Sequence, residues 1–244
     1  MNKILTIILV FFGTIAFGQH VEIDTFQLRS NHSFTDLKAD KMIFPIIQTG
    51  HEKIDSIINH DLKDKFTSKE YPNENLDSTL TKWAGDQVSY LDFEVSYNAN
   101  GILSLNISTE GCGAYCTHWT KYFNYSIETG ETLNISEIID TTGAFRTKVY
   151  TDKETQYGQQ KKELKELLND PASGLDESTY EWALEYYQNC ESSFDLETFA
   201  IYPDRLEIIE RCNPPNAIKY LTPIITLKYI HAEYEEYLKI KTKP

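Results

Sequence analysis

Alternating polar and apolar residues between positions 88 and 127 constrain the fold of this chain most strongly. From residue 88 to residue 97, the odd positions are more apolar than the even ones, which indicates a half-buried strand. Asn100 and Gly101 form an Asn-Gly pair typical of a tight turn, and apolar residues return from 102 to 109. A third strand is expected over residues 118–127. The sequence therefore predicts an antiparallel meander.

Apolar residues at helical spacing flank this meander on both sides. Residues 52–66 fit an amphipathic helix, and residues 76–84 fit a shorter one that ends before Gly85. Further elements are expected as short strands near residues 21–28 and 42–47, helices at 161–168, 178–187 and 230–240, a hairpin of 194–202 and 205–211, and a strand at 222–229. Strands in runs beside helices in runs predict the α+β class. We expect an antiparallel meander sheet plus a C-terminal hairpin and strand, with helices packed on one face.

Length and composition fit one compact unit with two lobes. We expect an N-terminal lobe with the meander at residues 19–135 and a C-terminal lobe at residues 136–244. The hydrophobic content of 41% excludes general disorder. The formal net charge of −14 opposes nucleic-acid binding, which depends on Lys and Arg that neutralise phosphates. It favours a cationic partner or simply a soluble protein with a solvated acidic surface.

Residues 1–18 have the features of a secretory signal peptide. Lys3 precedes an apolar run, and Ala16 and Gly18 place small residues at the −3 and −1 positions before Gln19. The run is shorter than the ~20 apolar residues of a membrane-spanning helix, and no later segment is apolar enough to span a bilayer. We therefore expect an exported protein, periplasmic or secreted, that is cleaved between Gly18 and Gln19 and has no membrane span in its mature chain.

Four cysteines in an exported chain predict two disulfides, for which three connectivities exist. Cys112 and Cys116 share one loop, whereas Cys190 and Cys212 flank the predicted hairpin. Strict hairpin register would separate Cys190 from Cys212 by ~16 Å, so that their pairing requires a bend, which the prolines at 214 and 215 could supply. The pairing Cys112–Cys116 with Cys190–Cys212 is favoured, and crossed bridges remain open.

Three stretches of the chain resemble one domain family of poorly defined function. Residues 44–47 with the helix that bears Asn59 resemble its opening strand and helix, and residues 111–131 resemble its glycine-rich loop, aromatic strand and Thr-Gly turn. Residues 194–238 resemble its closing hairpin, last strand and terminal helix. The family forms the extracytoplasmic region of lysozyme-sensing anti-sigma factors (RsiV) and the N-terminal region of a peptidoglycan deacetylase (PdaC). The resemblance implies an envelope protein without the deacetylase's catalytic domain.

The loop from Gly111 to His118 holds the chain's one cluster of candidate ligands. Cys112, Cys116 and His118 could bind zinc, but exported cysteines usually oxidise, so we expect no metal and no cofactor. No nucleophile elbow, P-loop or Rossmann glycine pattern occurs, and no catalytic residue is assigned. Because aromatic faces with polar tips suit sugars and protein partners, Tyr115, His118 and Trp119 are the predicted ligand-binding residues.

These observations leave three functions open. The first is an exported, non-catalytic binding module for an envelope glycan, a peptide or a basic protein such as lysozyme. The second is a hydrolase of envelope polymers with its site at the loop from Gly111 to His118. A paired-carboxylate glycosidase belongs here, because such a pair is defined only in space. The third is a structural envelope protein.

Overall fold

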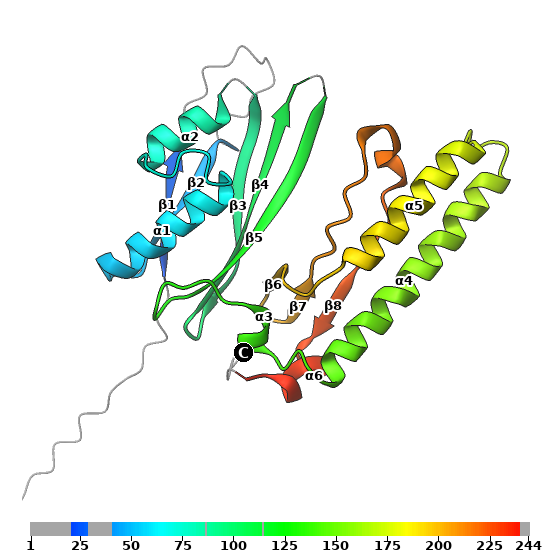
Figure 1. Ribbon diagram of the computed structural model, residues 1–244. Coiled ribbons are helices and arrows are strands. Elements are labelled where there is room, and N and C mark those ends of the chain that lie inside the picture. Colours follow the sequence, from blue (N-terminus) through cyan, green and yellow to red (C-terminus); the bar gives the residue numbers. More distant parts are fainter. Residues whose placement is uncertain (1–20, 29–40, 86, 114, 240–244) are drawn as a thin grey trace, which may run out of the picture.

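The computed structural model describes residues 21–28, 41–85, 87–113 and 115–239 (Figure 1). Within these ranges the chain forms three antiparallel sheets with helices packed beside them, which confirms the α+β class. The predicted signal peptide at residues 1–18 lies outside the described residues. None of the described helices is both long and apolar enough to cross a membrane.

The first sheet pairs β1 (Glu22–Gln27) with β2 (Ile43–Gln48). The two helices that follow, α1 (Glu52–Phe66) and α2 (Leu76–Ala84), have the predicted bounds. α1 packs on β2 through an amide-to-backbone pair. The side chain of Asn59 accepts a hydrogen bond from the Ile47 N–H and donates one to the Ile47 carbonyl, both at 2.8 Å.

The second sheet is the predicted meander, formed by β3 (Val88–Ala99), β4 (Ile102–Cys112) and β5 (Cys116–Ser126) in that order. Asn100 and Gly101 both have positive φ at its first turn, as an Asn-Gly hairpin requires. β5 begins two residues earlier than the sequence predicts, because Cys116 still pairs with Cys112 across the strands.

The C-terminal part combines two long helices with a third small sheet. Its elements are α3 (Ile135–Ile138), α4 (Ala144–Asn169), α5 (Glu177–Ser193), β6 (Phe199–Ile201), β7 (Arg205–Ile208), η2 (Asn216–Leu221), β8 (Leu227–Ile230), α6 (His231–Tyr234) and η3 (Glu235–Tyr237). β6, β7 and β8 pair antiparallel in that order. β6 also packs across the meander, so the two sheets meet at one end (Figure 1).

Several predicted elements differ from the structure, among them the two hairpin strands, which are shortened to β6 and β7. α4 begins at Ala144, whereas the sequence predicts a helix only from residue 161. The first half was not predicted because Lys153 and Tyr157 are among its buried residues, so that its apolar period is interrupted. The predicted strand at 222–229 is shortened to β8, since Gln156 of α4 bonds both main-chain groups of Thr226. The predicted helix at 230–240 ends early, and Leu238 forms an antiparallel bridge with Ile139.

Three apolar clusters form the core. The first lies between the meander, β1, β2, α1 and α2. The second contains Tyr97 and Ile102 of the β3–β4 hairpin together with residues of the third sheet, so it joins the two predicted lobes. The third lies between α4, α5 and η2. The meander is thus anchored to the C-terminal part at the Tyr97 end, while its other end carries the Cys112–Cys116 turn.

Candidate functional site

Both disulfides are formed, in the pairing favoured from the sequence. Cys112 is bonded to Cys116 with a Cα–Cα distance of 3.9 Å, and Cys190 to Cys212 with one of 5.3 Å. Two intrachain disulfides indicate an oxidising, extracytoplasmic compartment. Because all four cysteines are bonded, none offers a thiolate, and the described residues contain no group of metal-ligating side chains.

The second disulfide forms by a different route from the one predicted. Cys190 lies within α5 and not on a hairpin strand. The chain leaves β7 after Ile208, and Cys212 bonds to Cys190 on α5. The departure from strand register therefore starts before the prolines at 214 and 215. The bridge ties residues 209–213, called the far wall below, to α5.

The predicted ligand loop is mostly hairpin. β4 continues to Cys112 and β5 starts at Cys116, so only the short turn between them is irregular. Tyr115 lies on this turn and is 73% exposed. The ring of Trp119 lies over Gly111, where an added Cβ would come within 2.9 Å of the ring. Gly111 is therefore required for this packing.

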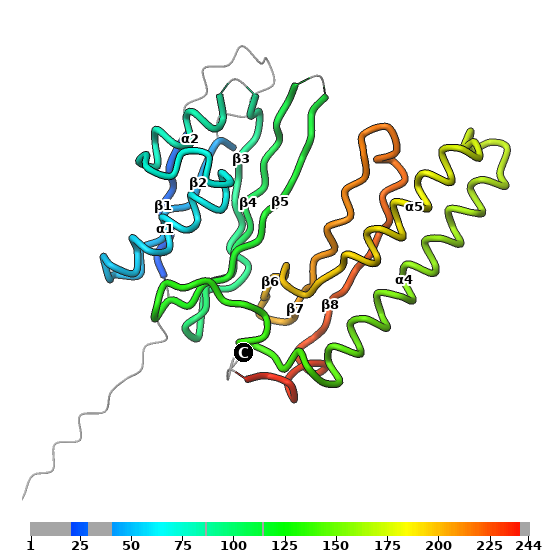
Figure 2. Tube along the Cα trace, viewed as in Figure 1, coloured from blue at the N-terminus to red at the C-terminus, as the bar shows by residue number. Residues whose placement is uncertain are grey.

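A cleft of about 760 Å³ lies between β5 and the far wall. Its lining includes successive residues of β5 from His118 to Tyr125, which belong to both faces of the strand. A cleft lined by both faces runs along the strand's edge rather than over one side of the sheet. In Figure 2 the orange trace after β7 rises beside the green trace of β5.

One face of β5 is turned toward α1. The Tyr125 hydroxyl donates to Asp61 Oδ2 at 2.9 Å, and burial raises the pKa of this tyrosine. The Lys121 ammonium donates to the carbonyls of Lys65 and Phe66 at 3.1 and 2.8 Å. These carbonyls belong to the last turn of α1, where a cation is favoured by the helix dipole. Burial lowers the pKa of Lys121.

The opposite face of β5 is polar and turned toward the third sheet. Asn124 is 5% exposed, and its Nδ2 donates to the Phe199 carbonyl at 2.9 Å. Because that carbonyl accepts, the amide cannot be flipped, and Oδ1 is the acceptor that remains. This Oδ1 has no hydrogen-bond partner among the described residues. Burial, followed by the negative charges of Glu207 and Glu94, raises the pKa of neighbouring Tyr122.

The outer edge of β5 is only partly paired. The Leu133 N–H donates to the Asn124 carbonyl at 2.8 Å, and the Ser126 N–H donates to the Glu131 carbonyl at 2.9 Å. In an antiparallel strand, the main-chain N–H and C=O groups of successive residues point to alternate edges. Since those of Asn124 and Ser126 point to the outer edge, the main-chain groups of the other even-numbered residues of β5 do so as well. The register with β4 is unbroken. His118, Thr120 and Tyr122 therefore also direct their main-chain N–H and C=O groups outward, and no described residue pairs with them.

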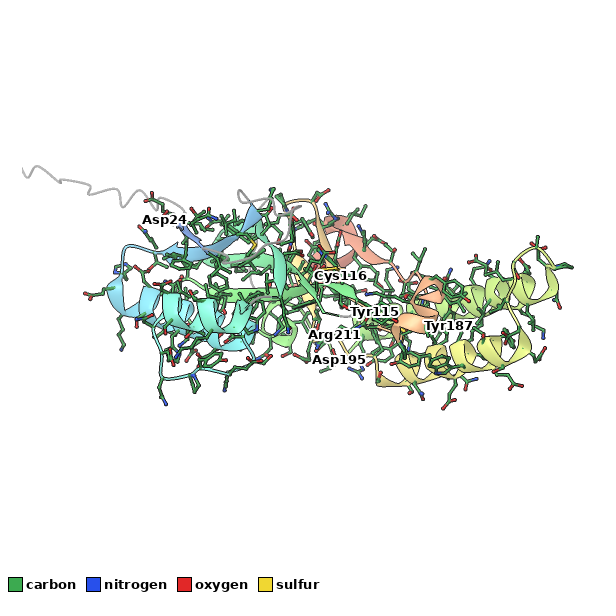
Figure 3. The ribbon with its side chains drawn as sticks, turned by 90° about the horizontal axis from the view of Figure 1, so that it is seen from above. Asp24, Tyr115, Cys116, Tyr187, Asp195 and Arg211 are labelled. Atoms are coloured by element: carbon green, nitrogen blue, oxygen red, sulfur yellow. A yellow bond between two sulfur atoms is a disulfide. The ribbon has the colours of Figure 1, made fainter. Side chains whose placement is uncertain are left out.

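The far wall carries both signs of charge. The Arg211 N–H donates to Glu210 Oε1 at 2.8 Å, and the Arg211 guanidinium lies 3.8 Å from Asp195. Burial raises the pKa of Glu210, and the bond from Arg211 opposes that shift. Figure 3 labels Arg211 and Asp195 together with Tyr115 and Cys116.

Two of the three predicted ligand residues line the cleft. His118 and Trp119 do so, and the His118 ring lies 5.9 Å from the Tyr90 ring, whereas Tyr115 is outside the lining. The sequence also predicts that Tyr122 and Asn124 face away from Phe123 and Tyr125, as the hydrogen bonds of Asn124 and Tyr125 confirm. The far wall was missed, because nothing in a local pattern shows that it lies opposite β5.

Comparison with known proteins identifies the fold alone. No protein-family profile matches the sequence, and no curated protein matches it either. The crystal structure of a DUF3298 family member from Bacteroides fragilis is similar over 93% of this chain and 100% of that one, with a TM-score of 0.53 and 14% identity. A DUF3298 family protein from Pseudomonas aeruginosa matches 90% of this chain and 94% of its own, with a TM-score of 0.48 and 14% identity. The chain thus has a fold similar to that of a protein in a domain-of-unknown-function family.

Proposed function

We propose that this protein is an exported, non-catalytic binding module of the cell envelope. Its ligand is an envelope glycan, a peptide or a basic protein such as lysozyme. The observation that carries the proposal is the cleft of about 760 Å³ beside β5, which is lined by aromatic and polar side chains including His118, Trp119 and Tyr122. The net charge of −14 and the resemblance to the RsiV and PdaC extracytoplasmic domains support the same function.

The surroundings of His118 support binding over catalysis. The residue is exposed on β5, and among the described residues no carboxylate forms an ion pair or hydrogen bond with it. A general base is usually oriented by such a third group. Cys112 and Cys116 are joined in a disulfide, so neither offers a nucleophilic thiolate beside His118.

Calorimetric titration of the purified, oxidised protein with lysozyme and with soluble peptidoglycan fragments tests the proposal. We expect saturable binding that weakens with salt for lysozyme, since opposite charges are screened. Failure to bind every cationic and glycan ligand would overturn the proposal.

A pair of tyrosine variants locates the site. Tyr122 lines the cleft, so Tyr122→Ala should weaken binding about tenfold or more, the effect of losing one buried aromatic contact. Tyr115 is exposed outside the lining and serves as the matched control. If Tyr115→Ala is the damaging change, the ligand binds at the hairpin turn and not in the cleft.

A hydrolase of envelope polymers is the second candidate, because His118, Glu197 and Glu210 line one cleft. Release of soluble fragments from purified peptidoglycan, lost in His118→Ala, would favour it. No release by the wild-type protein would leave binding alone.

A further inference from the structure

We infer that the outer edge of β5 accepts an extended, basic segment of a partner polypeptide as an additional β-strand. The inference rests on the proposed binding function. It narrows the ligand from a glycan, a peptide or a basic protein to an extended polypeptide segment. It is carried by the open main-chain groups of β5, by a buried acceptor in the same cleft and by the charges that surround them.

The open edge has the hydrogen-bonding pattern that strand addition needs. His118, Thr120 and Tyr122 each direct an N–H and a C=O outward, two residues apart, on an unbroken register. Strand addition gains its affinity from such main-chain groups and its specificity from alternate side chains. The cleft is lined by both faces of β5, so an added strand would have walls for both sets of its side chains.

The protein itself starts this additional ladder and then leaves it. Thr132 forms an antiparallel bridge with Tyr125, and the Leu133 N–H bonds to the Asn124 carbonyl at 2.8 Å. The chain then turns into α3 at Ile135. An incoming strand would continue the pairing from the point where residues 131–133 stop.

Asn124 indicates a ligand rich in hydrogen-bond donors. Asn124 lines the cleft and is 5% exposed, and its Oδ1, which lies just beneath the cleft surface, has no hydrogen-bond partner among the described residues. A buried acceptor left unpaired costs about 1–3 kcal/mol. A main-chain N–H, or the side chain of an incoming Lys or Arg, would supply the missing donor.

The surrounding charges indicate that the segment is basic. Glu94 is exposed on the face that β5 shares with β3, and after burial its negative charge helps to raise the pKa of Tyr122. Glu207 acts in the same direction but is itself paired with Arg205 and Lys228. The three cations that line the cleft are already engaged: Lys121 donates to carbonyls of α1, Lys65 lies 2.9 Å from Asp61, and Arg211 lies 3.8 Å from Asp195. With these cations engaged and a formal net charge of −14 on the chain, the electrostatic field favours a basic segment over an acidic one.

Selection of linear peptides of about eight residues on the immobilised, oxidised protein tests the inference. We expect enriched peptides that carry Lys or Arg, with affinities measured by fluorescence anisotropy. Thr120→Pro removes an outward N–H and leaves the hydrogen bonds to β4 intact. Edge strands tolerate proline at positions of this kind, where the N–H points away from the sheet. It should weaken peptide binding about tenfold or more, the effect of one lost main-chain bond and added bulk.

Thr120→Val is the matched control. It loses the hydroxyl that lies 2.8 Å from the Ser108 hydroxyl, as proline does, but keeps the N–H. It should bind peptide like the wild type. Because Thr120→Pro could unfold, N-methylation of the peptide provides a test that leaves the protein unchanged. Methylation at alternate peptide residues should abolish binding, and methylation at the intervening residues should not.

Strand addition would be overturned by peptide binding that Thr120→Pro leaves unchanged, by binding insensitive to N-methylation, or by formation of a dimer through the edge in place of peptide capture. Binding of lysozyme or peptidoglycan fragments that Thr120→Pro leaves unchanged would also overturn it, while the proposed function would survive. A protein that binds none of these ligands would overturn both.

Discussion

The two ends of β5 share one strand and one partner, β4, yet they have different surroundings. The inner end comprises residues 123–126. Here Phe123, Asn124 and Tyr125 are buried between α1 and the third sheet. At the outer end, residues 116–122, every described side chain is half-buried or exposed, and the main-chain edge is open. The difference teaches that the elements packed around a strand, and not its own sequence, decide which part supports the fold and which part is available to a ligand.

The largest difference between the two ends of β5 is expected when one aromatic ring is removed from each of them. Phe123→Ala should destabilise the protein by about 3–5 kcal/mol, because it empties a site in the core. Trp119→Ala should cost only about 1–2 kcal/mol, because that residue is only partly buried. Denaturant unfolding measures both, and equal losses would contradict a division between the ends.

The next test compares the two disulfides. Cys190 and Cys212 are 22 residues apart, whereas Cys112 and Cys116 are 4 apart. Loop-closure entropy predicts a loss of about 3 kcal/mol for Cys190→Ser with Cys212→Ser, against about 2 kcal/mol for Cys112→Ser with Cys116→Ser. Thermal melting without reductant checks the order. A larger loss at the hairpin turn would show that the outer end also carries the fold.

A third test uses two asparagines of the meander. Asn124→Ala leaves the buried Phe199 carbonyl without its donor and should cost about 1–3 kcal/mol. Asn106→Ala is the matched control, because its amide donates only to exposed Glu94, at 3.3 Å. We expect a loss below about 1 kcal/mol there. If both variants lose the same free energy of unfolding, the bond to Phe199 is not special.

The smallest effect concerns pH and the far wall. Burial raises the pKa of Glu210 above its ordinary value of 4.5, so the folded protein holds this proton more tightly than the unfolded chain. The stability from this group is complete below pH 4.5 and is lost as the pH rises through the folded pKa. Glu210→Gln should therefore gain stability relative to wild type between about pH 4 and pH 7. A constant difference across this range would contradict burial of the carboxyl.

Local periodicity predicts most of the fold and only part of the site. The meander, α1 and α2 were predicted because their apolar residues alternate or recur at helical spacing. The first half of α4 was not, because Lys153 is buried against α5 with its ammonium on the Glu191 carbonyl at 3.1 Å. The far wall is held by contacts between distant parts of the chain: Cys212 is bonded to Cys190 of α5, and the Ile209 N–H donates to the Thr198 carbonyl at 2.8 Å.

The position of the far wall also bears on self-association. An open strand edge is a template on which sheets of other copies can add, the route to aggregation. A lone strand needs only about 4.8 Å of lateral room, whereas a second copy would bring a whole sheet and its covering helices. The far wall lies across the cleft from β5. The far wall would therefore obstruct the sheet and helices of a second copy more than a single strand, which favours strand capture over edge-to-edge aggregation.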